Sequence, residues 1–199
     1  MMRLLLATQN KHKVEEFSRI LAPMGWEILP QDAVCPELDV EETGTTFAEN
    51  ARLKAMALYR ATGFPTVADD SGLCVDALDG APGVYSARYA GEGHDSDANI
   101  NKLLEELRNV PPENRTAQFV CSICTVFDEK DIVICEGRCS GSIGFERHGS
   151  DGFGYDPVFM VGERSFAELS GAEKDKISHR GMALRELYAL LKDRVNEEE

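Results

Sequence analysis

The sequence lacks a long uninterrupted hydrophobic run. Its first residues, MMRLLLATQNKHK, contain three consecutive leucines and then turn polar. They provide neither the apolar core of about 7 to 15 residues that a signal peptide needs nor a membrane-spanning length. We therefore expect a cytoplasmic protein without a membrane partner.

Basic residues are also scarce. The chain has 21 Lys and Arg against 35 Asp and Glu, a net charge of −14. Binding to duplex nucleic acid or to an anionic membrane requires a concentrated basic surface, so the composition argues against such partners. A small polyanion such as a nucleotide needs only a few convergent cations and a metal ion, and it remains compatible with this charge.

Internal repeats, low-complexity segments and clean linkers are absent as well. The 199 residues, 43% of them hydrophobic, suit one domain over residues 1–199, or two lobes that share a core.

The six cysteines do not have the spacing of a metal site. Cys121 and Cys124 lie in an alternating run, QFVCSICTVF, which predicts a strand with these two side chains on opposite faces. A hairpin centred on Glu129-Lys130 would bring Cys124 opposite Cys135, so a cross-strand disulfide is one interpretation. Buried thiols are the other, and the reducing interior of a cell favours them.

Two adjacent carboxylates, Asp69 and Asp70, follow a short apolar run and precede the turn dipeptide Ser71-Gly72. The pattern predicts a strand that ends at these acids. Adjacent carboxylates repel each other, so a fold that holds them together usually supplies a cation or a reaction that uses one. The simpler interpretation is that the pair ends a strand and starts a turn.

The N-terminal segment predicts a strand, a polar loop and a helix that ends near Gly25. Backbone N–H groups at such a helix start favour anions, and Lys13 would add a charge for a triphosphate. The loop lacks the glycines of a Walker motif. The alternative is that Thr8 or Asn10 caps the helix and Lys13 is solvated.

Other segments carry similar local signals. Thr46 and Glu49 have capping-box spacing ahead of a helix that ends before Gly63, and Asn50 and Lys54 lie one turn apart on it. Residues 117–127 and 132–139 predict a hairpin, with residues 141–145 as a third strand. The segment GSDGFGYDPVFMV combines glycines with aromatic rings and could stack on a planar ligand, or could be a hairpin with core aromatics.

These motifs together resemble the inosine triphosphate pyrophosphatase family of Ham1-like enzymes. The resemblance rests on T-x-N-x-x-K in the first loop, EETG-x-TF-x-EN-A-x-x-KA in the second helix, ADDSGL followed by GAPGVYSARYAGE, the glycine-rich segment, and Ser-His-Arg before the last helix. It runs from Ala7 to Leu184.

The resemblance implies an α/β fold, with a mixed twisted sheet, flanking helices and two lobes around a central substrate cleft. It also implies a homodimer. The implied activity is hydrolysis of inosine, deoxyinosine and xanthosine triphosphates (ITP, dITP and XTP) to the monophosphate and pyrophosphate, with Mg²⁺ as the cofactor.

The resemblance also assigns roles to individual residues. Asp70 is implied as the general base with Asp69 beside it, and Glu42 and Asp70 as the Mg²⁺ ligands. The phosphate-binding set comprises Thr8, Gln9, Asn10, Lys11, His12, Lys13, Lys54 and Ser71. The base-binding set comprises Phe153, Gly154, Tyr155, Asp156, Lys174, Ser178, His179 and Arg180. Gln9, Lys11 and His12 replace smaller residues often found at these positions.

Two other functions remain open. A Maf-like pyrophosphatase acting on pyrimidine or modified nucleotides would use similar chemistry, although the Ser178-His179-Arg180 segment and the Phe153 loop argue against it. A nucleotide-binding sensor without turnover would have no use for a water activator such as Asp70. An aspartyl-phosphate phosphatase needs Asp-x-Asp, a spacing that Asp69-Asp70 does not have.

Overall fold

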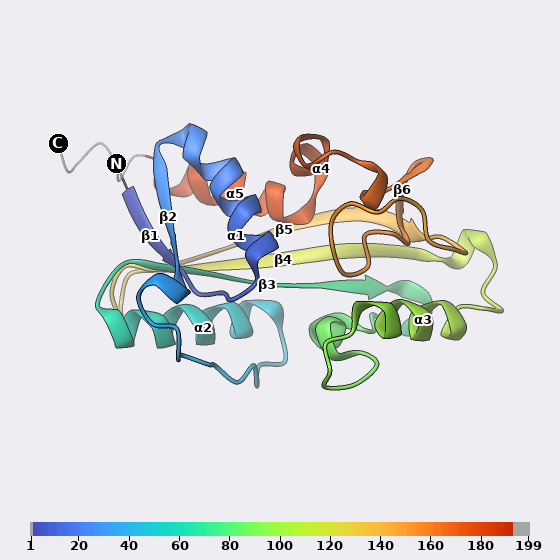
Figure 1. Cartoon of the computed structure of the whole chain (residues 1–199), viewed down its shortest axis with the longest axis horizontal. Coiled ribbons are helices and arrows are strands. Elements are labelled where there is room, and N and C mark those ends of the chain that lie inside the picture. Colours follow the sequence, from blue (N-terminus) through green and yellow to red (C-terminus); the bar gives the residue numbers. More distant parts are fainter. Residues whose placement is uncertain (1, 193–199) are drawn as a thin grey trace. The chain divides into compact units, whose positions relative to one another are not determined.

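A mixed β-sheet organises the computed structural model, which describes residues 2–192 (Figure 1). The strand order is β2-β1-β3-β4-β5-β6-β7. β1 pairs in parallel with β2 and β3, whereas β6 pairs antiparallel with β5 and β7. The strands are β1 (Met2–Leu6), β2 (Trp26–Pro30), β3 (Thr66–Val75), β4 (Thr116–Val126), β5 (Ile132–Ile143), β6 (Phe159–Val161) and β7 (Arg164–Ser165). The predicted α/β class with a mixed sheet is confirmed.

Within the described residues, five α-helices accompany the sheet: α1 (Lys11–Leu21), α2 (Phe47–Thr62), α3 (Ser96–Glu106), α4 (Gly171–Ile177) and α5 (His179–Leu191). The predicted capping box at the start of α2 is confirmed, because Thr46 and Glu49 each bond the other's backbone N–H. Gly63 ends α2 in the left-handed conformation at φ 72°, which glycine adopts without steric cost.

The described residues fall into two compact units. Unit 1 comprises residues 2–70, 121–137 and 180–192, and unit 2 comprises residues 71–120 and 138–179. The description of residues 1–199 as a single domain with two lobes stays a prediction, and so does the substrate cleft.

The core of unit 1 lies on both faces of its strands. On one face, α1 and α5 contribute Phe17, Leu21, Leu184 and other residues to a cluster with β1 and β4. On the other face, α2 contributes Ala51, Ala55 and Leu58 to a second cluster. Figure 1 shows α2 on one side of these strands and α1 with α5 on the other.

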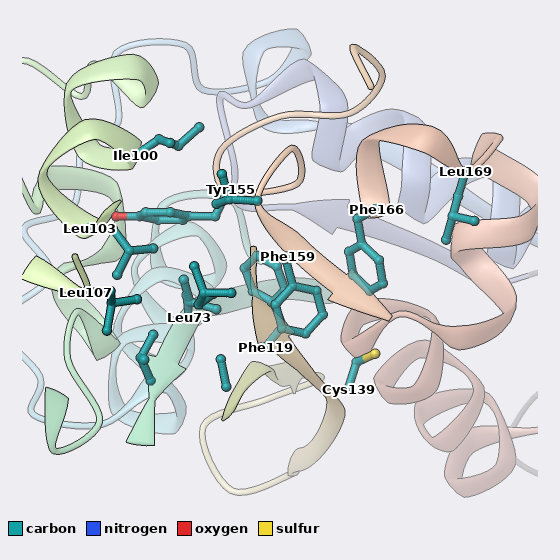
Figure 2. Close-up of a cluster of buried hydrophobic side chains, with 14 residues drawn as sticks. Leu73, Ile100, Leu103, Leu107, Phe119, Cys139, Tyr155, Phe159, Phe166 and Leu169 are labelled. Carbon is teal, nitrogen blue, oxygen red and sulfur yellow. The ribbon is translucent and has the colours of Figure 1, made fainter. Parts of the chain in front are cut away.

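The core of unit 2 is rich in aromatic rings (Figure 2). Phe119 lies 4.6 Å from Phe159 and 5.9 Å from Phe166 between ring centroids. Ile100 and Leu103 of α3 complete the cluster with Leu73 of β3. Two aromatic residues of the glycine-rich segment, Tyr155 and Phe159, therefore belong to this core.

Two predicted boundaries are wrong. Ser71-Gly72 is not a turn, because β3 continues without interruption to Val75. Residues 141–143 do not start a third strand, because β5 runs from Ile132 to Ile143. In β3, the glycine that suggested a turn sits inside an extended strand, where hydrogen bonding along the ladder overrides its local preference.

The cysteine prediction can be resolved. All six are free thiols. Cys121 and Cys135 belong to the cluster beneath α1 and α5, whereas Cys124 belongs to the cluster beneath α2. Burial raises the pKa of Cys124 to about 11 and that of Cys135 to about 12. Buried thiols are thus confirmed, and the cross-strand disulfide is wrong.

Among residues 2–192, no helix combines the length and the hydropathy that crossing a membrane requires.

Arg115 is a buried cation that holds unit 2 together. Its guanidinium donates to three backbone carbonyls, those of Leu107 at 2.8 Å, Ile143 at 2.8 Å and Gly144 at 2.7 Å. Only 2% of the residue is exposed. The side chain therefore joins the end of α3 to the end of β5.

We expect Arg115→Met to lower the free energy of unfolding by about 3 kcal/mol, because it leaves two buried carbonyls and one partly buried carbonyl without their donor. Urea unfolding followed by circular dichroism measures this change. Arg138→Met is the matched control. Arg138 is exposed and its Nη1 donates to the Gln118 Oε1 at 3.2 Å, and its loss should cost less than about 0.5 kcal/mol. Equal effects of the two substitutions would contradict the role of Arg115.

Candidate active site

The first loop reaches the two aspartates because β1 and β3 are parallel neighbours. Leu6 of β1 lies opposite Val67 of β3, and the Ala7 N–H donates to the Val67 carbonyl at 2.8 Å. β1 ends at Leu6, two positions before the pair on its neighbour, whereas β3 continues past Asp69 and Asp70 to Val75. The loop that starts at Thr8 therefore begins beside Asp69 and Asp70.

Asp69 lies on the face of β3 that packs against α1 and α5. Its Oδ1 is 3.0 Å from the Lys13 Nζ, and its Oδ2 accepts from the Arg180 Nη2 at 3.0 Å. The Cys121 thiol lies 3.9 Å from the same Oδ2. Arg180 also pairs with Glu16 of α1. The result is a buried network of two carboxylates and two cations.

Asp70 lies on the opposite face, towards α2. Its Oδ2 accepts from the Asn50 Nδ2 at 3.1 Å, and its Oδ1 is 3.4 Å from the Lys54 Nζ. The same Lys54 ammonium lies 2.5 Å from the Glu42 Oε1. Successive side chains of a strand point to opposite faces, so the two adjacent carboxylates are separated by the extended backbone.

The expected position of Asp69 beside Asp70 is therefore corrected. The sequence predicted that the strand ends at this pair. In the strand, Asp69 faces Lys13 and Arg180 while Asp70 faces Lys54 and Asn50. The described partners of the Asp69 carboxylate are cations on the α1 and α5 side, and its assistance to Asp70 stays a prediction.

The two carboxyl groups have opposite pKa shifts. Burial alone would raise the pKa of Asp69, but the charges of Lys13 and Arg180 outweigh burial and hold it well below its usual range. Burial raises the pKa of Asp70, and the charge of Glu42 raises it further, although Lys54 opposes both. Asp69 is thus a fixed negative charge, and Asp70 is the carboxylate that takes up a proton more readily.

Lys54 is held as a cation. Burial would lower its pKa, but Asp70 and Glu42 outweigh burial and raise it. A lysine that two carboxylates share stays protonated and can serve as a fixed positive charge for phosphate oxygens.

Glu42 and Asp70 are suitable ligands for a hard divalent cation. One oxygen of each converges on the Lys54 ammonium, which marks a point where both carboxylates attract positive charge. Mg²⁺ is usually held by one or two carboxylates, with waters and substrate phosphates as the other ligands. Within residues 2–192, no group of three or more His, Cys, Asp or Glu side chains forms a metal site, so an ion on these two carboxylates would take its other ligands from water and phosphate.

The polar loop of the phosphate-binding set begins with a helix cap. Asn10 caps α1, and its Oδ1 accepts from the His12 and Lys13 N–H groups. Its own N–H donates to the Thr8 Oγ1 at 3.2 Å. The cap is the alternative that the sequence left open for Asn10, and it is confirmed. The solvated Lys13 of the same alternative is wrong, because Lys13 lies in the first turn of α1 with its Nζ 3.0 Å from the Asp69 Oδ1.

The remaining members of the phosphate-binding set differ in exposure. Gln9, Lys11 and His12 are exposed at the start of α1, and Ser71 is partly buried in β3, where unit 2 begins. Their phosphate contacts stay predictions.

In unit 2, Asp156 organises the glycine-rich segment. Its Oδ2 accepts from the Phe153 N–H at 2.9 Å and from the Lys174 Nζ at 2.7 Å. The Lys174 Nζ also lies 5.0 Å from the centroid of the Phe153 ring, within the range of a cation–π contact. Asp156 and Lys174 are buried and Phe153 is half-buried. This triad of Phe153, Asp156 and Lys174 brings together three residues of the predicted base-binding set.

The other members of that set lie nearby or in the core. The His179 ring stacks on Phe119 at 4.6 Å between centroids, and Ser178 caps the end of α4. Gly154 has a left-handed backbone at φ 60°. The Tyr155 side chain is part of the core (Figure 2), and its hydroxyl donates to the Ser86 carbonyl at 2.8 Å. We therefore correct the assignment of the Tyr155 side chain, which packs in the core of unit 2.

Arg180 differs from the predicted base contact. It belongs to unit 1, and its guanidinium pairs with Asp69 and Glu16. Burial would lower its pKa, but the charges of Asp69 and Glu16 together outweigh burial and raise it above its usual value. These contacts favour an electrostatic role next to Asp69, and contact of Arg180 with a base stays a prediction.

Two residues of the site were not predicted. Glu16 is 8% exposed and Asn50 is fully buried. Glu16 looks like an ordinary polar residue of an amphipathic helix, and no sequence signal separates it from Glu15. Asn50 precedes Lys54 by one helical turn, and that spacing is the signal that the sequence offers for it.

Comparisons with known proteins agree on one family. The model of the Ham1 family matches residues 4–190. A dITP/XTP pyrophosphatase of Bacillus licheniformis is 47% identical over 193 residues, which cover 96% of this chain and 98% of the relative. One of Desulforamulus reducens is 49% identical over 192 residues and covers 96% of each chain.

Solved structures show the same likeness. A HAM1 protein from Coxiella burnetii has a TM-score of 0.88 and 42% identity, over 97% of this chain and all of that one. A nucleoside-triphosphatase, also titled dITP/XTP pyrophosphatase, from Mycobacterium abscessus has a TM-score of 0.76 and 44% identity, over 96% of this chain. The match of the family model and the identity of these full-length relatives lead to one conclusion: the chain belongs to the Ham1 family.

Proposed function

We propose that this protein hydrolyses ITP, dITP and XTP to the nucleoside monophosphate and pyrophosphate, and so removes damaged purines from the nucleotide pool. The observation that carries the proposal is the placement of Asp70, a buried carboxylate with a raised pKa next to Lys54 and Glu42. The full-length relatives named dITP/XTP pyrophosphatases support the choice of substrate. Family membership also disfavours the Maf-like alternative.

In this proposal, the residues that bind the phosphates belong to unit 1, apart from Ser71, the first residue of unit 2. Lys13 and Lys54 neutralise phosphate oxygens, and Thr8, Gln9, Asn10, Lys11, His12 and Ser71 add hydrogen bonds or charge. Lys54 is partly buried and fixed by two carboxylates, so it is oriented before the substrate arrives. Phosphate transfer depends mainly on such positioning and on neutralisation of charge.

Asp70 acts as the general base. It takes a proton from a water molecule whose oxygen attacks phosphorus, the α–β phosphoanhydride bond breaks, and pyrophosphate leaves with the bonding electrons. The raised pKa of Asp70 makes it a better proton acceptor than a solvated aspartate. Asp69 stays charged and keeps Lys13 and Arg180 in place.

Glu42 and Asp70 would hold Mg²⁺ in this proposal. When bound, the ion supplies positive charge that stabilises the phosphate oxygens during cleavage. Its two carboxylate ligands come from the loop before α2 and from β3, and Lys54 lies between them.

The base binds in unit 2 in this proposal. Phe153 stacks on the purine, and Lys174, Ser178 and His179 provide polar groups for its edge. Hypoxanthine and xanthine carry an oxygen at position 6, where adenine carries an amino group. Donors that face this oxygen would meet the adenine amino group as a second donor, a mismatch that costs about 1 to 3 kcal/mol.

A homodimer and a cytoplasmic location complete the proposal. Both follow from the sequence and its resemblance. Light scattering after gel filtration measures the mass of the particle and tests the dimer.

The first test is pyrophosphate release with Mg²⁺ from ITP, dITP and XTP, with ATP and GTP as comparison substrates and with identification of the monophosphate. We expect strong preference for ITP, dITP and XTP. Release of single phosphates would contradict the proposal, and no turnover on any purine would contradict it and favour a sensor.

Asp70→Asn should lower kcat by about 100-fold or more, because it removes the proton acceptor. The fold should persist, since an amide can still interact with Asn50. Kinetics with ITP give kcat, and calorimetry with ITP on the same variant shows whether the nucleotide still binds. Full activity of this variant would exclude Asp70 as the base.

Asp69→Asn should act on stability instead. The change leaves Lys13 and Arg180 in the interior without the carboxylate that neutralises them, and loss of one partner in a buried ion pair costs about 3 to 5 kcal/mol. Thermal and urea unfolding measure the loss. If Asp69→Asn were as stable as the wild type, the assignment of Asp69 as the structural carboxylate would be wrong.

Phe153→Ala should raise KM for every purine triphosphate by a similar factor, about fivefold or more. Stacking of a base on an aromatic ring contributes about 1 to 3 kcal/mol and tolerates any base, so the preference for ITP over ATP should survive. Phe64→Ala, at a ring that is 62% exposed in unit 1, is the control and should leave KM unchanged. An unchanged KM in Phe153→Ala would remove Phe153 from the base site.

A further inference from the structure

The Asn50 amide connects the two segments that carry the proposed metal ligands. Its Nδ2 donates to the Asp70 Oδ2 at 3.1 Å. Its Oδ1 accepts from the Gly44 N–H at 2.8 Å. Gly44 follows Glu42 by two residues, so one fully buried side chain joins the loop of Glu42 to Asp70.

Both ends of the Asn50 amide are determined by their partners. A backbone N–H can only donate, so the carbonyl oxygen of Asn50 must face Gly44. An ionised carboxylate can only accept, so the amide nitrogen must face Asp70. Among side chains of this size, asparagine supplies both the acceptor that Gly44 requires and the donor that Asp70 requires. Aspartate lacks the donor, and leucine lacks both groups.

Asn50 is itself fixed on a rigid support. It is the fourth residue of α2, directly after the capping box of Thr46 and Glu49, and its N–H donates to the Thr46 carbonyl at 3.1 Å. On the other side, the backbone at Gly44 packs closely against the Asn50 side chain. A Cβ at Gly44 would lie 2.6 Å from the Asn50 Oδ1 and 2.7 Å from the Glu49 Cβ. The loop therefore packs against Asn50 at the closest approach that glycine permits.

The bond from Asn50 also restricts the rotation of the Asp70 carboxylate. Asn50 holds Oδ2, while Oδ1 lies 3.4 Å from the Lys54 Nζ, next to Glu42. Rotation of the carboxylate would break the bond to Asn50 and leave a buried donor without an acceptor, a state that buried polar groups in proteins rarely adopt.

We propose that Asn50 is a positioning residue, which orients the Asp70 carboxylate and sets its separation from Glu42, so that both can hold the metal ion and Asp70 can accept a proton. This inference rests on the proposed function and deepens it. Residues that orient metal ligands through a hydrogen bond commonly contribute about 10- to 100-fold to metal affinity or activity.

The chain contains a matched control in Asn99. It too is the fourth residue of a helix, α3, and its N–H donates to the Asp95 carbonyl. Its Oδ1 accepts from the Ala90 N–H at 2.6 Å, and its Nδ2 donates to the Ala87 carbonyl at 3.0 Å. It is 4% exposed. Both of its side-chain partners are backbone groups of unit 2, so it shares the structural role of Asn50 without a catalytic partner.

The experiment compares Asn50→Leu with Asn99→Leu, and Asn50→Asp with Asn99→Asp, in the full chain. Unfolding temperatures show the structural cost of each change. Kinetics with ITP and Mg²⁺ give kcat and KM, and calorimetry with Mn²⁺ in the absence of nucleotide gives the metal affinity of wild type, Asn50→Leu and Asn99→Leu.

We expect both Asn50 variants to lose about 10- to 100-fold in kcat, with KM for ITP within about threefold of the wild type. Asn50→Leu should also bind Mn²⁺ at least about tenfold more weakly. Asn50→Asp keeps the acceptor for Gly44 and removes the donor to Asp70, so its loss of kcat identifies the Asp70 bond as the cause. The Asn99 variants should lose stability to a similar extent and keep kcat and Mn²⁺ affinity.

The outcomes separate this inference from the proposed function. An active wild type whose Asn50 variants keep kcat within about threefold of their Asn99 counterparts would overturn the positioning role and leave the proposed function intact. Binding of Mn²⁺ by Asn50→Leu as tightly as by the wild type would also overturn the positioning role and leave the proposed function intact. A wild type that neither releases pyrophosphate nor binds Mn²⁺ would overturn the proposed function and this inference with it. If Asn50→Leu does not fold, the kcat of Asn50→Asp alone tests the positioning role of Asn50.

Discussion

The extended backbone of β3 at Asp69 and Asp70 is the constraint on which the site depends. Because alternate side chains of a strand point to opposite faces, two carboxylates that are adjacent in sequence have different surroundings. One meets the helices α1 and α5, and the other meets α2. The repulsion expected between these two adjacent carboxylates is reduced because their side chains point to opposite faces of β3 and because each faces at least one cation of its own.

The separation gives the carboxylates different electrostatic properties. On the α1 side, Lys13 and Arg180 outweigh the burial of Asp69, so its charge is permanent. On the α2 side, Lys54 is shared between Asp70 and Glu42, and its charge does not offset burial. One backbone position is thus suited to a structural anion and the next to proton transfer. The difference arises from the number of cations that each face supplies.

The sequence predicted the fold class and most members of the site, because motifs such as T-x-N-x-x-K and ADDSGL are local patterns that a family resemblance can carry. It could not predict the separation of Asp69 and Asp70. Ser71-Gly72 has the composition of a turn, and only pairing with neighbouring strands keeps it extended. Glu16 was missed for a similar reason, since its burial depends on Arg180, which is 164 residues away in the chain.

The charges of unit 1 explain how an acidic protein can bind a polyanion. Glu16 and Asp69 balance Lys13 and Arg180, while Glu42 and Asp70 together exceed Lys54 by one negative charge. This set of residues therefore has no surplus cation for a triphosphate, and each lysine already faces a carboxylate. A divalent cation held by Glu42 and Asp70 would reverse this balance and leave Lys54 available to phosphate oxygens. The net charge of −14 is compatible with the same arrangement. Because the carboxylates that would hold the metal also fix Lys54, the protein needs no basic surface to bind its substrate.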